Sequence, residues 1–357
     1  MWIYKMCQEN MPLIIFIALL SFFSSCEILG IDEDNESLDP GPRNYEWTVD
    51  SVGGAPDMWV GWANTIWGSA PNDVWIGLSG GYYNLWHYDG ETWSPWPYRE
   101  GPDGFTGSFY SIYGFAQDDV WMGGGDGELW HFDGSTWKLF YTYNPEGLGG
   151  PNIFDIWGTS PSDIYAVGTV STGLDNPSYK GFILHYDGRR WRELLVTDFG
   201  MQFNRIRKEN RGIYLSGSGP YSYQTISDSV SLYILNNKSL NVLYSKSRKE
   251  ASSVNLNKFG NRIYFVIENE VTDKYFNSIL PFTLSEDVYH VNGRHEKDMF
   301  ITSEDGIAHY NGEDIQLLVN DVVQPSAVLF EKDVFFFAND YVEGTNLIYH
   351  GTLTKKD

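Results

Sequence analysis

The chain has 357 residues, with 24 Lys and Arg against 47 Asp and Glu, which gives a formal net charge of −23 at pH 7. Such an acidic surface repels phosphate backbones and anionic lipid head groups, so we expect no nucleic-acid partner. The length exceeds that of one ordinary packed core and favours either two domains or one large repeat fold. Aromatic residues make up 17% of the chain, which suits sheets that pack face to face.

Residues 1–25 have the pattern of a bacterial export signal. Lys5 precedes an apolar run at 11–23 that is too short to span a bilayer. The sequence FSSC, which ends at Cys26, resembles the bacterial lipobox, although Phe23 stands where Leu is usual. The resemblance implies a lipid on Cys26 and cleavage before it, which leaves a mature chain without an internal disulfide. An ordinary secretory signal followed by an incidental cysteine is the alternative.

Residues 26–44 are acidic and interrupted by Pro40, Gly41 and Pro42, which predicts a solvated tether. Glu27 follows the cysteine instead of the Asp that resembles an inner-membrane retention signal, so the outer membrane is the expected location. An acidic stretch behind the cysteine also resembles the export signal of surface lipoproteins in the Bacteroidota. A spacer without any address content is the alternative.

A unit of four short segments recurs along the next part of the chain. Its copies at 66–93, 112–137 and 156–191 are rich in Trp, Tyr, Val and Ile and are divided by Pro, Asp and Gly. This composition is typical of consecutive antiparallel strands. A repeated unit of this size indicates an array of small sheets.

The second segment of each unit has Asp or a substitute, an aliphatic residue and an aromatic residue. Seven copies start at Asp73, Asp119, Asp163, Gly212, Arg262, Asp298 and Asp333. Their spacing is that of β-propeller blades, so we expect an all-β fold: a seven-bladed propeller of four-stranded antiparallel blades over residues 45–357. The DVW and HYDGxxW repeats resemble those of secreted bacterial propeller lipoproteins, a resemblance that implies no named enzyme family.

The two ends of the propeller sequence complement each other. The last blade lacks a fourth strand, whereas the strand at 45–49 has no blade before it. Trp47 precedes Trp67 by the same interval that separates equivalent aromatic residues of later blades. We therefore expect the strand at 45–49 to complete the last blade and close the ring, and deletion of residues 44–50 to lower the melting temperature.

Four histidines recur at one position of the repeat: His87, His131, His185 and His309. Imidazole is a common metal ligand and base, but equivalent positions of different blades lie too far apart to hold one ion at ~2 Å. We expect each histidine to brace its own blade by a hydrogen bond, and the repeated Asp residues to be structural as well. The sequence calls for no metal and no cofactor.

The long, irregular connections lie on one side of the predicted ring. This side, the loop face, carries the connections between strands two and three and from strand four to the next blade. Binding residues gather in variable loops on rigid scaffolds. The aromatic residues that we expect to bind ligand there are Tyr82, Tyr83, Trp96, Tyr98, Phe105, Tyr141, Tyr143, Tyr179, Tyr221 and Tyr223. Such rings stack on sugars and also anchor protein interfaces, so a glycan or a protein ligand fits; coverage of small loop cores is the alternative.

No GxSxG, HExxH, P-loop or CxxC motif is present, so no catalytic residue is assigned. The arginines, Arg205 and Arg207 among them, show no spacing that marks a carboxylate clamp. The expected function is that of a monomeric, lipid-anchored binding or scaffold propeller. One alternative is a glycoside hydrolase or lyase whose carboxylates come from separate blades at the channel mouth. Another is a scaffold for outer-membrane assembly.

Overall fold

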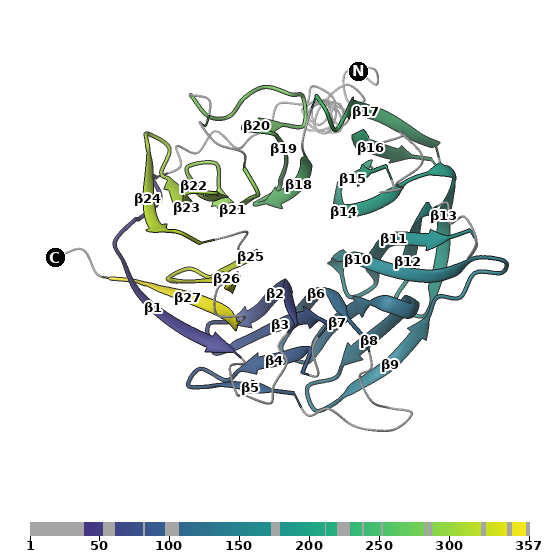
Figure 1. The fold of residues 1–357 in the computed structure, drawn as a ribbon, viewed down its shortest axis with the longest axis horizontal. Coiled ribbons are helices and arrows are strands. Elements are labelled where there is room, and N and C mark those ends of the chain that lie inside the picture. The colour runs from purple at the N-terminus through teal and green to yellow at the C-terminus, as the bar shows by residue number, and fades with distance from the viewer. Residues whose placement is uncertain are drawn as a thin grey trace, which may run out of the picture. The chain divides into compact units, whose positions relative to one another are not determined.

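Seven antiparallel sheets surround a central axis in the unit Pro40–Asp357 (Figure 1). The computed structural model describes residues 39–52, 61–80, 83–96, 107–172, 179–210, 212–219, 229–237, 239–250, 253–281, 284, 288–322, 326–340 and 345–354. The predicted seven-bladed propeller is confirmed. Within these ranges, no helix has the length and apolar character needed to cross a bilayer.

The first strand of each blade lies innermost, and the later strands follow outward (Figure 1). Blade 1 contains β2 (Trp62–Ala70), β3 (Asp73–Ser79), β4 (Leu85–Tyr88) and β5 (Trp93–Pro95); blade 2 contains β6 (Phe109–Ala116), β7 (Asp119–Gly124), β8 (Glu128–Phe132) and β9 (Trp137–Thr142), with the 3-10 turn η1 (Gly125–Gly127); blade 3 contains β10 (Gly149–Ser160), β11 (Asp163–Ser171), β12 (Tyr179–Tyr186) and β13 (Trp191–Gly200). Blade 4 contains β14 (Gln202–Glu209), β15 (Gly212–Ser218), β16 (Ser229–Asn236) and β17 (Ser239–Ser247); blade 5 contains β18 (Val254–Phe259), β19 (Arg262–Ile267) and β20 (Glu270–Asp273); blade 6 contains β21 (His290–His295), β22 (Asp298–Ser303), β23 (Gly306–Tyr310) and β24 (Ile315–Asn320); blade 7 contains β25 (Ser326–Leu329), β26 (Asp333–Asp340), β27 (Thr345–Leu353) and β1 (Tyr45–Val52).

All seven second strands begin at the residue predicted from the repeat. These strands are apolar on both faces because each blade is covered on both sides by its neighbours; in β3, every residue from Val74 to Leu78 is buried. Blade 5 differs from the others, since its described residues form a three-stranded sheet. An isolated bridge between Thr272 and Ser278 continues that sheet outward.

Aromatic residues of the repeat join neighbouring blades. Trp75 of blade 1 packs against Trp137 of blade 2, with ring centroids 5.5 Å apart. Trp121 of blade 2 packs in the same way against Trp191 of blade 3 at 5.4 Å. The aromatic residue of each DVW segment therefore meets the last Trp of the next HYDGxxW segment, and one repeated contact links sheet to sheet.

The first strand of the chain closes the ring. All eight residues of β1 pair with β27 in antiparallel register, and Trp47 lies opposite Gly351 (Figure 1). The expected closure is confirmed. Gly351 is needed at this position because a Cβ there would lie 3.0 Å from the Trp47 ring. Trp47 then packs against Phe336 of β26, with ring centroids 6.1 Å apart.

The residues just before β1 bind to blade 6. The amide of Gly41 donates to the carbonyl of Lys297 at 2.8 Å. Arg43 forms an ion pair with Asp314 at 2.5 Å and donates to the carbonyl of His309 at 3.0 Å. These contacts join Gly41 and Arg43 to blade 6 within the unit Pro40–Asp357.

We predict that Trp47→Ala lowers the free energy of unfolding by about 2–4 kcal/mol, because the half-buried ring packs against Phe336 and the core shared by blades 6 and 7. Thr48→Ala, at an exposed position of the same strand, is the matched control and should leave stability within about 0.5 kcal/mol of wild type. Urea unfolding measures both; equal stability of the two variants would contradict the role of β1 in closure.

Candidate functional site

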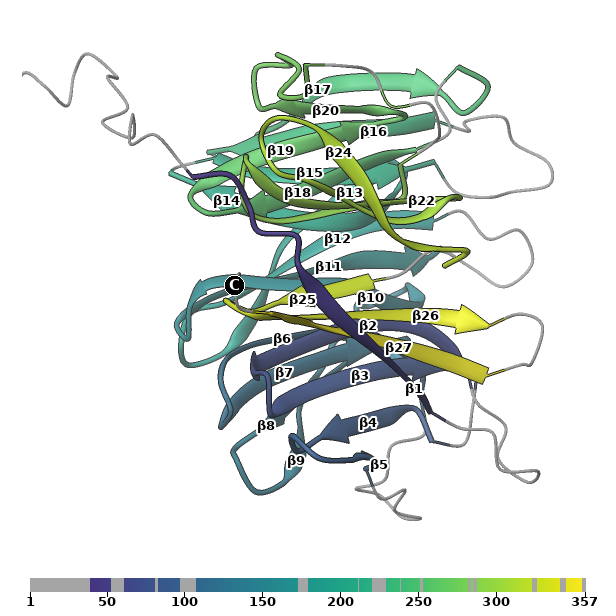
Figure 2. The same cartoon turned by 90° about the vertical axis from the view of Figure 1, so that its left-hand side faces the viewer.

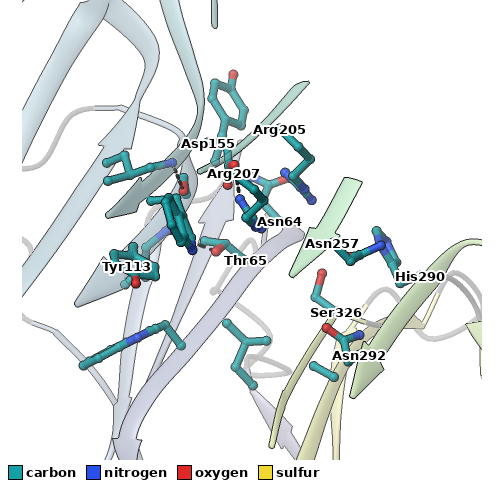
Figure 3. A pocket seen from close by; sticks show the side chains of 18 of the residues that line it. Asn64, Thr65, Tyr113, Asp155, Arg205, Arg207, Asn257, His290, Asn292 and Ser326 are labelled. Carbon is teal, nitrogen blue, oxygen red and sulfur yellow. Dashed lines mark hydrogen bonds and ion pairs between the residues drawn. The ribbon is translucent and has the colours of Figure 1, made fainter. Parts of the chain in front are cut away.

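The first strands of all seven blades surround a channel on the axis. They line a cavity of about 250 Å³. Figure 3 shows Asn64, Arg205 and Arg207 on one side of this cavity and Asn257, His290, Asn292 and Ser326 on the other. A second cavity, of about 430 Å³, shares Asn64, Tyr110 and Arg205 with the first. We call the second cavity the channel mouth.

The loop face is the side of the ring where β26 ends and β27 begins, on the right of Figure 2. The residues that line the channel mouth place the mouth at this face. Residues near the starts of first strands and the ends of second strands line it. Both kinds of strand end lie at the loop face by the up-and-down order of each blade. The channel therefore communicates with the side on which the sequence predicts binding.

Four β-bulges direct side chains into the mouth. The pairing of the first strand with the second shifts register in blades 1 to 4, between residues 63 and 65, 109 and 111, 153 and 155, and 203 and 205. A bulge inserts one unpaired residue and re-aims its side chain. The inserted residues are Asn64, Tyr110, Phe154 and Asn204, and all four line the mouth. The rings of Tyr110 and Phe154 lie 5.4 Å apart.

The residue after each bulge ties its blade to the next. Thr65 Oγ1 accepts the amide of Ile112 at 3.1 Å, and Ser111 Oγ accepts the amide of Ile156 at 2.8 Å. Asp155 Oδ2 accepts the amide of Ile206, also at 2.8 Å. In blade 4 the equivalent residue is Arg205. Its guanidinium has donors only, so it cannot accept an amide of the next blade as the other three side chains do.

Positive charge prevails along the channel although the whole chain is strongly acidic. Four cationic side chains line the two cavities: Arg205, Arg207, Lys258 and Arg248. Asp155 is the one carboxylate among the described lining residues; it is 6% exposed and forms an ion pair with Arg207 at 2.6 Å. Lys258 lies over the Trp157 ring, 5.2 Å from its centroid. Among the described lining residues, the cations therefore outnumber the carboxylates by four to one.

Arg205 lies in the channel without a carboxylate in contact among the described residues. Its hydrogen bonds go to the main-chain carbonyls of Phe154 at 3.5 Å and Asn204 at 3.3 Å, and within the described chain it forms no ion pair. Burial lowers the pKa of Arg205, with Asp155 opposing and Arg207 adding to the effect. Burial and the Arg205 cation also lower the pKa of His290 to about 4, which leaves this channel imidazole neutral near pH 7.

The repeated histidines take part in structure, as expected. Each donates an Nε2–H hydrogen bond to the carboxylate of the Asp that begins the second strand of its own blade, at 2.7–2.9 Å. Each also packs against the aromatic residue two positions after that Asp, for example His87 on Trp75 with ring centroids 4.1 Å apart. Blade 7 contains a fifth pair, His350 with Asp333 at 2.8 Å. The sequence repeat does not predict this pair, because His350 follows a variable connection. Among described residues, no group of three or more His, Cys, Asp or Glu is arranged to hold a metal ion.

Five of the aromatic residues predicted to bind ligand lie within the described chain. Tyr143 is 3% exposed; its hydroxyl donates to Glu193 at 2.7 Å, and burial raises its pKa. Tyr141 packs against the buried cluster of blades 2 and 3 that contains Tyr143. Trp96 packs on Trp75 at 5.2 Å.

Tyr83 packs against the core shared by blades 7 and 1, and Tyr179 begins β12. None of the five lines either described cavity. The structure thus brings Tyr141 and Tyr143 together as core and does not join these residues into one site. The other predicted residues lie outside the described ranges: Tyr82, Tyr98, Phe105, Tyr221, Tyr223 and Cys26.

These features define a seven-bladed propeller with a cationic axial channel, and similar folds occur among solved structures. One is YCF48 bound to D1 peptide, with a TM-score of 0.55 and 13% identity over 88% of this chain and 98% of that chain. Another is the extracellular domain of BT4673 from B. thetaiotaomicron, with a TM-score of 0.54 and 10% identity over 88% of this chain and 43% of that chain. No protein-family model matches the sequence, and no curated protein matches it. At these identities the likeness shows the fold alone.

We predict that acid destabilises the propeller through three of the repeated Asp residues, Asp73, Asp163 and Asp298, because the folded structure lowers the pKa of each carboxyl. Burial raises the carboxyl pKa of Asp163, but hydrogen bonds from Lys208, Thr159 and His185 outweigh burial and hold that pKa well below its ordinary value. A carboxyl whose pKa is lowered in the folded state stabilises the protein above its unfolded pKa of about 3.9 and loses this effect as pH falls through the folded pKa.

The free energy of unfolding, measured in urea at successive pH values, should therefore fall below about pH 4. Asp163→Asn should cost about 1.5–3 kcal/mol at pH 7 and make this acid slope shallower. Asp118→Asn, at an exposed turn position, is the control. An Asp163→Asn profile parallel to that of wild type would refute the assignment.

Proposed function

We propose that this protein is a non-enzymatic binding propeller of the bacterial cell envelope, anchored by a lipid on Cys26, that binds a protein or glycan ligand at the channel mouth. The observation that carries the proposal is the set of four bulges. They place Asn64, Tyr110, Phe154 and Asn204 in one cavity of about 430 Å³. A cavity of this size falls in the range of sites for small ligands and short chain segments.

The chemistry of the mouth supports binding. Amide side chains offer both donors and acceptors, and the neighbouring Tyr110 and Phe154 rings offer apolar surface. A glycosidase needs two carboxyl groups across the bond it cleaves. Around the two cavities the described residues supply one, Asp155, which is buried and paired with Arg207.

The similar folds support the same role. YCF48 was solved with a bound peptide, and the BT4673 domain is extracellular. Together with the export signal, they favour a binding module that works outside the cytoplasm. The envelope location and the lipid rest on the sequence around Cys26.

We predict that the double variant Tyr110→Ala, Phe154→Ala loses ligand binding. Wild-type protein is probed on a glycan array and on a peptide array that tiles envelope proteins of a bacterial proteome. Retained glycans or peptides should bind the double variant at least about tenfold more weakly, since the apolar surface of the mouth is gone. Tyr275→Ala, 72% exposed beyond the outer strand β20 of blade 5 and not part of the mouth lining, is the matched control and should bind as wild type does.

Unchanged binding by the double variant would place the site elsewhere and overturn the proposal. Release of new reducing ends from a retained glycan would show that the protein cleaves the glycan, and a catalytic function would then replace the proposed binding function. Retention of no ligand on either array would also count against the proposal.

We predict that Cys26 carries the lipid. In cells fed an alkyne fatty acid, the full chain should be labelled and sediment with membranes, whereas Cys26→Ser should be unlabelled. Cys7→Ser, within the export signal, is the control and should keep its label. Equal labelling of the Cys26→Ser variant would refute the anchor. Protease treatment of intact cells then tests surface exposure: a chain that is degraded only after lysis faces the periplasm.

A further inference from the structure

We infer that the channel binds a carboxylate of an acidic peptide segment through the guanidinium of Arg205 and the side-chain amide of Asn257, while the rest of the segment occupies the mouth. The inference rests on the proposed function and names the chemistry of its ligand. Arg205 comes from β14 and Asn257 from β18, the first strands of adjacent blades, and both side chains line the 250 Å³ cavity (Figure 3).

The charge of the lining selects an anion. Asp155 is committed to Arg207 and to the amide of Ile206, so it leaves Arg205 without a carboxylate partner in the described chain. Arginine binds carboxylates through two parallel N–H donors, and such charge-assisted hydrogen bonds are about twice as strong as neutral ones. An anionic group bound in the channel would supply the ion-pair partner that Arg205 lacks among the described residues.

An unused hydrogen-bond donor on the other side of the cavity from Arg205 indicates the same chemistry. Asn257 Nδ2 is buried and has no hydrogen-bond partner in the described structure. Buried donors are almost always satisfied, so a buried orphan in a cavity wall indicates a place for an acceptor. A carboxylate is an acceptor only, and it can satisfy Asn257 and Arg205 at once.

The asparagines of the mouth favour a peptide over an acidic sugar. Asn64 Nδ2 donates to the carbonyl of Phe109 at 2.9 Å, and Asn255 Nδ2 donates to that of Tyr289 at 2.8 Å. Their side-chain oxygens are left as acceptors, which suit the N–H groups of a peptide backbone. Sugar hydroxyls need acceptors as well, and proteins commonly supply carboxylates for them. Among the described lining residues the one carboxylate is Asp155, which already pairs with Arg207.

The acidic exterior does not prevent this binding. Charges farther than a Debye length, about 8 Å at physiological ionic strength, are largely screened. A buried guanidinium acts at short range in a medium of lower dielectric, where its attraction for a carboxylate outweighs the screened repulsion of the outer surface. The net charge of −23 therefore slows encounter, whereas the local charge of the channel determines which ligand stays.

The test is isothermal titration of the full propeller with acetyl-hexaglutamate amide and acetyl-hexaglutamine amide at 0.15 M salt. Hexaglutamate should bind with a 1:1 stoichiometry, and hexaglutamine at least about tenfold more weakly. Arg205→Gln should weaken hexaglutamate binding about 10- to 100-fold, while Arg205→Lys, which keeps the charge, should recover part of the loss. Arg189→Gln, at an exposed turn of blade 3, is the matched control and should bind as wild type does.

Melting curves of the variants show whether the ring still folds, and Arg205→Lys keeps the test decisive should Arg205→Gln be unstable. Equal affinity of wild type and both Arg205 variants, equal affinity for the two peptides, or no hexaglutamate binding at millimolar concentration would each overturn the inference. Tighter binding of trigalacturonate than of hexaglutamate would assign the site to an acidic sugar. An array ligand that depends on Tyr110 and Phe154 but not on Arg205 would overturn this inference while sustaining the proposed function.

Discussion

The pairing of β1 with β27 is the interaction on which the rest of the structure depends. Without it, blade 7 would have three strands, β27 would become its exposed outer edge, and nothing would join the two ends of the propeller sequence. Closure fixes the seven first strands around one axis, and the axial cavity takes residues from every one of them. A site built in this way cannot exist in part of the ring. The binding chemistry of the channel is therefore coupled to a strand that lies 293 residues before its partner in the chain, from Val52 to Thr345.

Repeated and variable residues have separate tasks in this ring. The Asp–His pair behaves as a unit: blades 4 and 5, which have Gly212 and Arg262 in place of Asp, have Ile234 and Asp273 opposite the aromatic residue where the others have His. A buried carboxylate without its hydrogen-bond donor would be costly, so both members change together. The bulged positions vary freely, from Asn64 to Tyr110, because their side chains face a cavity and not a neighbouring sheet.

The sequence predicted the blades and the closure because both leave local signals. Each second strand has a recognisable strand pattern, and the interval from Trp47 to Trp67 equals the interval between equivalent aromatic residues of later blades. It did not predict the channel site. A bulge shifts register by one residue without a local motif, and the groups around Arg205 come from different blades. The available signal was the position before the repeated Ile, which changes from hydroxyl to carboxylate to cation in Thr65, Ser111, Asp155 and Arg205. Among the loop aromatics predicted to bind ligand, Tyr143 packs into a local core, a placement that its sequence context does not reveal.

A rigid, closed ring with a cationic channel inside an acidic shell accounts for these features together, and its closure can be measured directly. Native-state hydrogen exchange reports the free energy of opening for each amide. We expect the β1 amides paired with β27 to exchange as slowly as those of β26 and in the same cooperative opening. Exchange of the β1 amides orders of magnitude faster than that of β26 would show that the ring opens at this seam, and would contradict the account.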